Sequence, residues 1–311
     1  MTTLIIIVAI LGAGAVFTYV GVRRIERANP PRGRIIDVRG LRQHVVELGR
    51  GADDGALPVV LVHGAGANLE DMCVALSERL AAKHRIIAID RPGFGWSERA
   101  GRDASSPAYQ AEILHETLDK VGVDKAIFVG HSWGGTLALT YALNFPQRVS
   151  GLVLIAPPTQ PPSRLIAWNN AVLATPIGWL FARTLALPFG AALLRPGVKL
   201  AFLPQTMPSG YVERSASALI LRPASLMANW ADVGGLHYFL KAEMGRYAGL
   251  AAPTSVFVGD RDPLVPQGHC NDLADICPNV TVTVLPGIGH MLHHAAADQI
   301  VAAVEAMAGS K

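Results

Sequence analysis

The sequence has few cysteines and few charges. Its three cysteines, Cys73, Cys270 and Cys277, show no metal-ligand spacing and are too few for a disulfide framework. Only 16% of the 311 residues are charged, and a formal net charge of +3 is too small to argue for nucleic-acid binding. The chain has no internal repeat and no low-complexity segment. Its length then suits one large α/β domain with an insertion, or two smaller domains.

The longest apolar run lies at the N-terminus. From Leu4 to Val22 there is no charged residue, and this run of about 19 residues matches a helix that crosses a bilayer. Arginines follow directly, so the positive-inside rule puts the rest of the chain on the cytoplasmic side. A cleaved signal peptide is the alternative, although Met1-Thr2-Thr3 lacks the basic side chain that it requires. We predict a transmembrane anchor over residues 1–28, ended by Asn29-Pro30-Pro31.

A second informative stretch is Gly130-His131-Ser132-Trp133-Gly134. An apolar strand pattern at 126–129 precedes it, and an apolar segment without proline, 135–143, follows it. A strand that enters a helix through G-x-S-x-G is typical of a nucleophile elbow, in which small neighbours permit a tight turn that exposes the serine hydroxyl. The N-terminus of the helix then supplies N–H groups for an oxyanion. The alternative is an ordinary strand–turn–helix in which Ser132 caps the helix.

Further strands and helices alternate on both sides of this turn. The predicted elements are a hairpin at 34–38 and 41–47, strands at 58–62, 85–90, 151–156, 254–258 and 280–285, and helices at 69–82 and 105–121. Such alternation predicts a parallel sheet covered by helices on both faces.

Five short motifs, each just after a predicted strand, resemble the successive signatures of the α/β-hydrolase superfamily. They are His63-Gly64-Ala65-Gly66, the segment Asp90-Arg91-Pro92-Gly93-Phe94-Gly95-Trp96-Ser97, the turn at Gly130–Gly135, Gly259-Asp260-Arg261-Asp262-Pro263-Leu264-Val265-Pro266, and Gly287-Ile288-Gly289-His290. The resemblance covers Arg34 to about Ala156 and Ala251 to the end. It implies an α/β-hydrolase fold with a mostly parallel, doubly wound sheet. The two parts of the core are then residues 29–157 and 251–311, and residues 158–250 form an inserted helical cap.

The resemblance also implies a set of catalytic residues. Ser132 is the expected nucleophile, and His290 is the expected base because histidine titrates near neutrality and the chain order Ser, Asp, His is the one this fold uses. Asp262 stands three residues before the Val-Pro pair and is the expected acid, whereas Asp260 is interpreted as a turn residue. His293 and His294 lie close enough to His290 to compete for its role.

Two backbone N–H groups are expected to form an oxyanion hole. The resemblance assigns them to Ala65 and Trp133, with Gly66 as the alternative donor. The bulky indole of Trp133 is also expected to form part of the pocket wall. Three other histidines, His44, His63 and His131, are interpreted as structural.

The predicted cap has its own pattern. Apolar helical stretches are predicted at Trp168–Leu187 and Ser215–Trp230, and no acidic residue occurs in the cap before Glu213. Arg164, Arg183, Arg195 and Lys199 are the basic residues of its first half. An apolar helix with sparse basic residues suits either a membrane interface or a buried cap helix with a solvated basic edge. Both interpretations predict a hydrophobic substrate.

The resulting hypothesis is a membrane-anchored, lipase-like serine hydrolase that cleaves a carboxylic ester of a small hydrophobic substrate through an acyl-enzyme. No metal or organic cofactor is implied, and no nucleic acid. Epoxide hydrolases and haloalkane dehalogenases resemble the Asp90–Ser97 region but carry aspartate at the nucleophile position, so Ser132 argues against both. C–C bond hydrolases and cofactor-free perhydrolases keep a serine and remain alternatives. A non-catalytic accessory or binding protein of the same fold is a further alternative.

Overall fold

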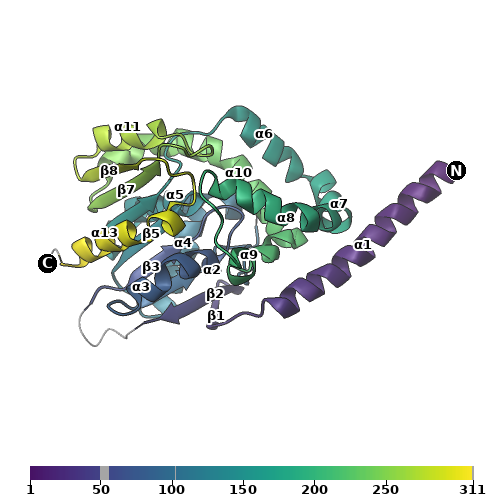
Figure 1. The fold of residues 1–311 in the computed structure, drawn as a ribbon, viewed down its shortest axis with the longest axis horizontal. Helices are drawn as coiled ribbons and strands as arrows, with labels where there is room; N and C mark the ends of the chain where they lie inside the picture. The colour runs from purple at the N-terminus through teal and green to yellow at the C-terminus, as the bar shows by residue number, and fades with distance from the viewer. Residues whose placement is uncertain (50–55, 102, 310–311) are drawn as a thin grey trace.

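A computed structural model describes residues 1–49, 56–101 and 103–309 and is built around one eight-stranded sheet (Figure 1). The strand order is β1-β2-β4-β3-β5-β6-β7-β8. Their bounds are β1 Arg34–Val38, β2 Leu41–Leu48, β3 Val59–Val62, β4 Ile86–Ile89, β5 Ala126–His131, β6 Val149–Ile155, β7 Thr254–Gly259 and β8 Val280–Leu285. Only the pairings of β2, with β1 and with β4, are antiparallel. The predicted α/β-hydrolase fold with a mostly parallel sheet is therefore confirmed.

The central strands are buried on both faces, which explains their unbroken apolar sequences. All four residues of β3 are buried, and alternate side chains point to opposite sides of the sheet. Val60 and Val62 join the core beneath α4 (Pro107–Lys120) and α5 (Trp133–Asn144). Val59 and Leu61 join the core on the other face, beneath α13 (Ala297–Gly309) and the helical segment after β3.

That segment is predicted as one helix over Leu69–Ala82, and it is helical throughout but not uniform. It consists of α2 (Leu69–Met72), a π-helical turn (Cys73–Ser77) and α3 (Glu78–Leu80). Asn68 begins it, because its side-chain oxygen accepts a hydrogen bond from the Glu70 N–H at 2.9 Å. The remaining core helices are α11 (Gly268–Ile276) and α12 (Leu292–Ala295).

The residues between β6 and β7 form helices above the carboxyl ends of the strands (Figure 1). They are α6 (Arg164–Leu173), α7 (Pro176–Thr184), α8 (Ala186–Phe202), α9 (Tyr211–Arg214) and α10 (Pro223–Glu243).

Both cap helices predicted from the sequence differ from the structure. The stretch Trp168–Leu187 is helical, as predicted, but it is divided among α6, α7 and the start of α8, because Pro176 starts a new helix and α6 and α7 meet at 68°. A helix over Ser215–Trp230 is wrong in position. Its first part is a 3₁₀ turn (Ser217–Leu221), and the helix begins only at Pro223.

The N-terminal helix α1 (Thr2–Ala28) extends away from the body of the molecule, and Figure 1 shows its second half beside α7 and α8. Within the described chain it is the one single helix long and apolar enough to cross a membrane, a property shared by signal sequences. The Thr18 hydroxyl donates to the Thr184 carbonyl at 3.4 Å. A Cβ added at Gly14 would collide with the same carbonyl, and one at Gly21 with Leu187. These small residues let α1 pack closely against the cap.

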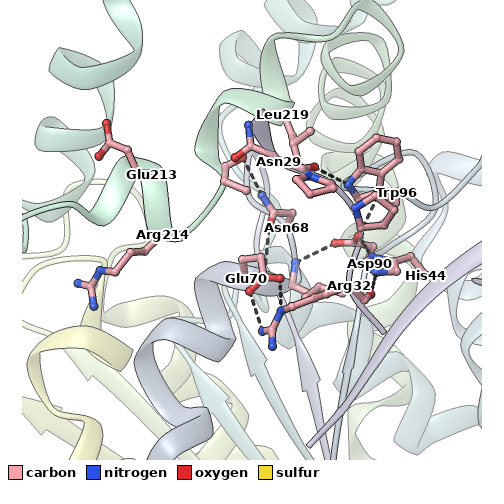
Figure 2. Close-up of a pocket in the computed structure, with 14 residues that line it drawn as sticks. Asn29, Arg32, His44, Asn68, Glu70, Asp90, Trp96, Glu213, Arg214 and Leu219 are labelled. Carbon is pink, nitrogen blue, oxygen red and sulfur yellow. Dashed lines mark hydrogen bonds and ion pairs between the residues drawn. The ribbon is translucent and has the colours of Figure 1, made fainter. Parts of the chain in front are cut away.

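The segment that follows α1 is fixed to the core domain by polar contacts (Figure 2). The Trp96 indole N–H donates to the Asn29 carbonyl at 3.1 Å, and Arg32 pairs with Glu70 at 2.6 Å. His44 lies buried on β2, as expected of a strand residue, with Nδ1 2.6 Å from the Asp90 carboxylate. Burial lowers the pKa of His44, but the hydrogen bond and charge of Asp90 outweigh it, so this pKa is raised.

Candidate active site

Ser132 occupies the turn between β5 and α5 with φ 51° and ψ −124°. This positive φ is strained for a residue with a side chain, and the Ser132 N–H anchors it by donating to the Ile155 carbonyl at 2.7 Å. A Cβ at Gly130 would collide with the Gly134 backbone, and one at Gly134 with the carbonyl of His63. The two flanking glycines are therefore required for the strand and helix to close around the serine.

The serine faces a cavity of about 590 Å³ between the core and the cap. Trp133 and His290 line the same cavity, and the Trp133 indole, predicted as pocket wall, is almost fully buried between Arg91 and α10. The cap contributes mainly apolar side chains from α8 and α10, among them Leu193, Leu194 and Leu236.

The structure pairs His290 with Asp262 and not with Asp260. Nδ1 of His290 lies 2.7 Å from Oδ2 of Asp262, and both side chains are buried. The other Asp262 oxygen accepts the N–H groups of Leu264 and Val265 at 2.8 and 3.0 Å, so the carboxylate is held on both sides. Asp260 instead accepts the Gly287 N–H at 2.6 Å and closes a turn.

The expected oxyanion-hole donors, Ala65 and Trp133, have different surroundings from Gly66, the alternative donor. Trp133 is the first residue of α5, where backbone N–H groups have no partner inside the helix. Ala65 lines the cavity beside Ser132. The N–H of Gly66 donates to the side-chain oxygen of Asn229, on cap helix α10, at 2.7 Å. Gly66 is therefore engaged in holding the cap.

Two further histidines have structural partners behind the cavity. His131 donates from Nε2 to the His290 carbonyl at 3.1 Å. Its burial, together with the charges of His293 and His290, holds its pKa well below the ordinary value. His63 contacts the Gly64 carbonyl at 2.8 Å and accepts the Arg91 N–H at 3.0 Å, and burial lowers its pKa to about 4.

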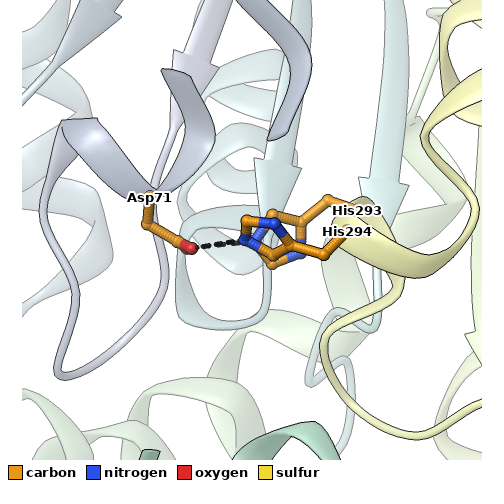
Figure 3. A group of neighbouring side chains, drawn as sticks. All are labelled: Asp71, His293 and His294. Carbon is orange, nitrogen blue, oxygen red and sulfur yellow. Dashed lines mark hydrogen bonds and ion pairs between the residues drawn. The ribbon is translucent and has the colours of Figure 1, made fainter. Parts of the chain in front are cut away.

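A buried polar cluster behind His290 was not predicted (Figure 3). Asp71 accepts from Nε2 of His293 at 3.0 Å, from Nε2 of His294 at 2.9 Å and from the Tyr211 hydroxyl at 2.6 Å. Asp71, His293 and His294 offer three metal-type ligand atoms within 4.8 Å of one another. Their hydrogen bonds already satisfy these atoms, so the cluster is explained as support for the loop that carries His290. The adjacent histidines were a sequence signal, but their partner lies more than 200 residues away.

A second unpredicted feature is the buried ion pair of Arg91 and Asp232. Arg91 follows β4, Asp232 lies on α10, and the pair is 2.6 Å apart with both side chains fully buried. The Arg91 guanidinium stacks 4.0 Å from the centre of the Trp133 ring, and the Trp133 indole N–H donates to the Asp232 carbonyl at 3.3 Å. This pair connects the cap directly to the elbow.

The sheet, the elbow serine and the buried His–Asp pair together define the α/β hydrolase class. The chain belongs to the alpha/beta hydrolase fold family, whose model matches residues 58–297.

Among curated proteins, the chain is 28% identical over 283 residues to the dihydrolipoyllysine-residue acetyltransferase component of the acetoin cleaving system of Pseudomonas putida, covering 88% of this chain and 69% of that protein. It is 38% identical over 128 residues to 2-hydroxymuconate semialdehyde hydrolase of Pseudomonas putida, covering 41% of this chain and 44% of the relative. It is 34% identical over 159 residues to 1-acylglycerol-3-phosphate O-acyltransferase ABHD5 of Sus scrofa, covering 46% and 45%. The chain thus spans under half of the last two relatives.

Solved structures show the same fold at low identity. A hydrolase from Pseudomonas aeruginosa PA01 superposes with a TM-score of 0.72 at 21% identity, covering 89% of this chain and 98% of that one. A thermophilic esterase from Thermogutta terrifontis superposes with a TM-score of 0.69 at 22% identity, covering 88% and 95%.

Proposed function

We propose that the protein is a serine hydrolase that cleaves carboxylic esters of hydrophobic substrates. The observation that supports this most directly is that Ser132, in the elbow, and His290 line the same apolar cavity. Asp262 orients His290 through Oδ2, while its Oδ1 accepts a backbone N–H. A carboxylate on Nδ1 selects the imidazole tautomer whose Nε2 is free to accept a proton.

In the proposed reaction, Ser132 Oγ attacks the ester carbonyl carbon while His290 Nε2 takes the hydroxyl proton. The resulting oxyanion is stabilised by the N–H groups of Ala65 and Trp133. As the tetrahedral intermediate collapses, the C–O bond to the alcohol breaks, and the alkoxide receives the proton from His290. Water, activated by the same histidine, then attacks the acyl-serine and releases the acid and free Ser132.

The cavity lining supports a neutral, hydrophobic ester. Among the described residues that line it, none is Lys or Arg, so a substrate with a free carboxylate would lose its hydration without gaining a cationic partner. The similarity to a semialdehyde hydrolase supports a second candidate, cleavage of a C–C bond next to a carbonyl by the same residues. A perhydrolase would use the same residues again. A purely accessory role would not need the elbow, the His–Asp pair and free oxyanion donors together.

We further propose that α1 anchors the enzyme in a membrane with the catalytic domain on the cytoplasmic side. Its uncharged run ends at Val22, and Arg23 and Arg24 follow directly, which favours retention of that end of the helix in the cytoplasm. Its close packing against the cap through Gly14, Thr18 and Gly21 supports an uncleaved helix, because cleavage would remove these contacts.

The test is labelling of the full-length protein with a fluorophosphonate, followed by turnover of p-nitrophenyl esters of graded chain length. Wild type should be labelled at Ser132. Ser132→Ala should lose the label while staying folded, with kcat lower by about 10⁴–10⁶. A folded wild-type protein that resists the probe would refute the serine-hydrolase function. Labelling without turnover of any ester would favour C–C bond cleavage.

A further inference from the structure

Cap helices α6, α7 and α8 present large apolar side chains to the outside. Six of these side chains are between 45% and 77% exposed: Leu165, Trp168, Ile177, Trp179, Leu180 and Phe189. The segment from Arg164 to Phe202 contains no Asp or Glu and only four basic residues. Exposing an apolar surface of this extent to water costs free energy, and such surfaces mark sites of contact with another protein or with a membrane.

The packing of α1 against α7 fixes how deep this surface would lie if α1 crosses a bilayer. The uncharged run ends at Val22, which therefore marks the membrane boundary. Gly14, which contacts Thr184 at the end of α7, lies eight residues further in. At 1.5 Å per residue this is about 12 Å along the α1 axis. A leaflet has a hydrocarbon depth of about 15 Å, so α7 would be inside it. Figure 1 shows α6 and α7 displaced toward the N-terminus of α1, with the sheet and C-terminus at the opposite end.

Arg183 and Trp179, both on α7, are arranged as such side chains are at a membrane interface. The guanidinium of Arg183 stacks 4.1 Å from the centre of the Trp179 ring. Arg183 also lines an open crevice of about 1110 Å³ between α1 and the domain, away from the apolar outer surface. Long basic side chains that reach back to water, beside tryptophans, are typical of helices that lie in an interface.

A mainly apolar groove adjoins the active-site cavity along the last turns of α8. The groove has a volume of about 720 Å³, and it shares Gly197, Ala201 and Leu264 with the cavity. Leu200 and Leu203 line its outer part and are 63% and 50% exposed. The groove and the cavity that holds Ser132 therefore share a wall of α8 and Leu264, and Arg261 is the charged side chain among the residues that line the groove.

We propose that α6 and α7 lie in the cytoplasmic leaflet beside α1, with α8 starting at the leaflet surface where Leu187 meets Gly21, and that the groove at the far end of α8 admits the acyl chain of a long-chain lipid ester drawn from that membrane. This inference rests on the proposed ester hydrolase function and names its substrate source. A lipid leaflet is the occupant that follows from α1, because the exposed face is continuous with the membrane-spanning helix.

Immersion is tested on the full-length protein in phosphatidylcholine vesicles that contain a lipid with a nitroxide high on its acyl chain. Ile177→Cys and Lys120→Cys are each labelled with an environment-sensitive fluorophore. The native cysteines are buried, and Lys120 is the exposed last residue of α4, close to the start of β5 and so at the opposite end of that strand from Ser132 and the cap. Fluorescence at position 177 should fall at least about twofold with the quencher lipid, since interfacial helices lie within reach of the upper acyl chain. Fluorescence at position 120 should not change.

Absence of quenching at position 177 overturns the proposal. If an unquenched position 177 can be cross-linked to a second copy of the chain, this face is assigned to dimerisation.

The groove is tested by the ratio of two rates, hydrolysis of a long-chain diacylglycerol in vesicles and hydrolysis of soluble p-nitrophenyl butyrate. Leu200→Asp should lower this ratio at least about tenfold, because an acyl chain would have to displace water from a carboxylate. Leu200→Met and the distant surface change Ile276→Asp should keep the wild-type ratio. An unchanged ratio in Leu200→Asp, with Ser132 still labelled, refutes the groove as the entrance. If wild type hydrolyses neither substrate, the proposed function fails, while the quenching experiment still decides immersion.

Discussion

Replacing Asp262 by asparagine should disable the proposed base through a change of tautomer, with little change in shape. Oδ1 of Asp262 accepts two backbone N–H groups, from Leu264 and Val265. At position 262 an asparagine must point its side-chain oxygen toward the N–H groups of Leu264 and Val265. If its NH₂ faced them instead, these donors would have no acceptor. Its NH₂ then faces Nδ1 of His290. That nitrogen must become an acceptor, so the proton moves to Nε2, where the imidazole no longer accepts a proton from Ser132.

The expected loss in kcat is about 10⁴, as for the same change in other serine hydrolases, which corresponds to about 5.5 kcal/mol of barrier. The assay is p-nitrophenyl butyrate turnover, with fluorophosphonate labelling kinetics as a second measure of Ser132 reactivity. Asp260→Asn is the matched control, since an amide oxygen can still accept the Gly287 N–H, and its loss should stay below about tenfold. The opposite ranking would refute the assignment of Asp262 as the orienting acid.

Three further predictions concern stability and anchoring. Asp232→Ala leaves the Arg91 charge buried without its carboxylate and should reduce the free energy of unfolding by about 3–5 kcal/mol in urea titrations in detergent, whereas the exposed Asp275→Ala should change it by less than about 0.5 kcal/mol. Burial lowers the pKa of His63 to about 4, so between that value and its unfolded pKa near 6.5 the unfolded state binds more protons and stability falls as the pH falls. His63→Asn should flatten this dependence by up to about 1.4 kcal/mol per pH unit, and an unchanged slope would exclude His63 as its source. Deleting residues 1–29 should make the protein extractable by carbonate with ester hydrolysis retained, because cap helices that lie in one leaflet without crossing it no longer have a spanning helix to hold them, whereas the full-length protein should stay in the pellet. A full-length protein found soluble with a new N-terminus within or just after residues 13–28 would indicate a cleaved signal peptide.

The fold could be predicted because its signals are local. Short apolar or β-branched strands predict the sheet, and the polar or glycine-rich motifs after β3, β4, β5, β7 and β8 mark the loops with candidate site residues. The separation of Asp262 from Asp260 also depends on local spacing. Contacts that join distant segments carry no such signal. Asn229 reaches Gly66 across 163 residues, and Asp71 reaches His293 across 222. The misplaced boundaries of the cap helices have a different cause, because their prediction rests on apolar periodicity alone, whereas Pro176 and Pro223 are the local signals that start new helices.

These distant contacts divide the cap into two parts with different roles. Helix α10 is bound to the catalytic core through Asp232 on Arg91 and through Asn229 on the loop beside the oxyanion donors. Movement of α10 would therefore disturb the elbow, because Arg91 stacks on Trp133. Helices α7 and α8 instead pack against α1, and α8 lines the outer part of the cavity. Under the proposed function, α10 and the α6 helix packed closely on it preserve the geometry of the reaction, and changes in α8 can alter which esters enter without altering the chemistry at Ser132.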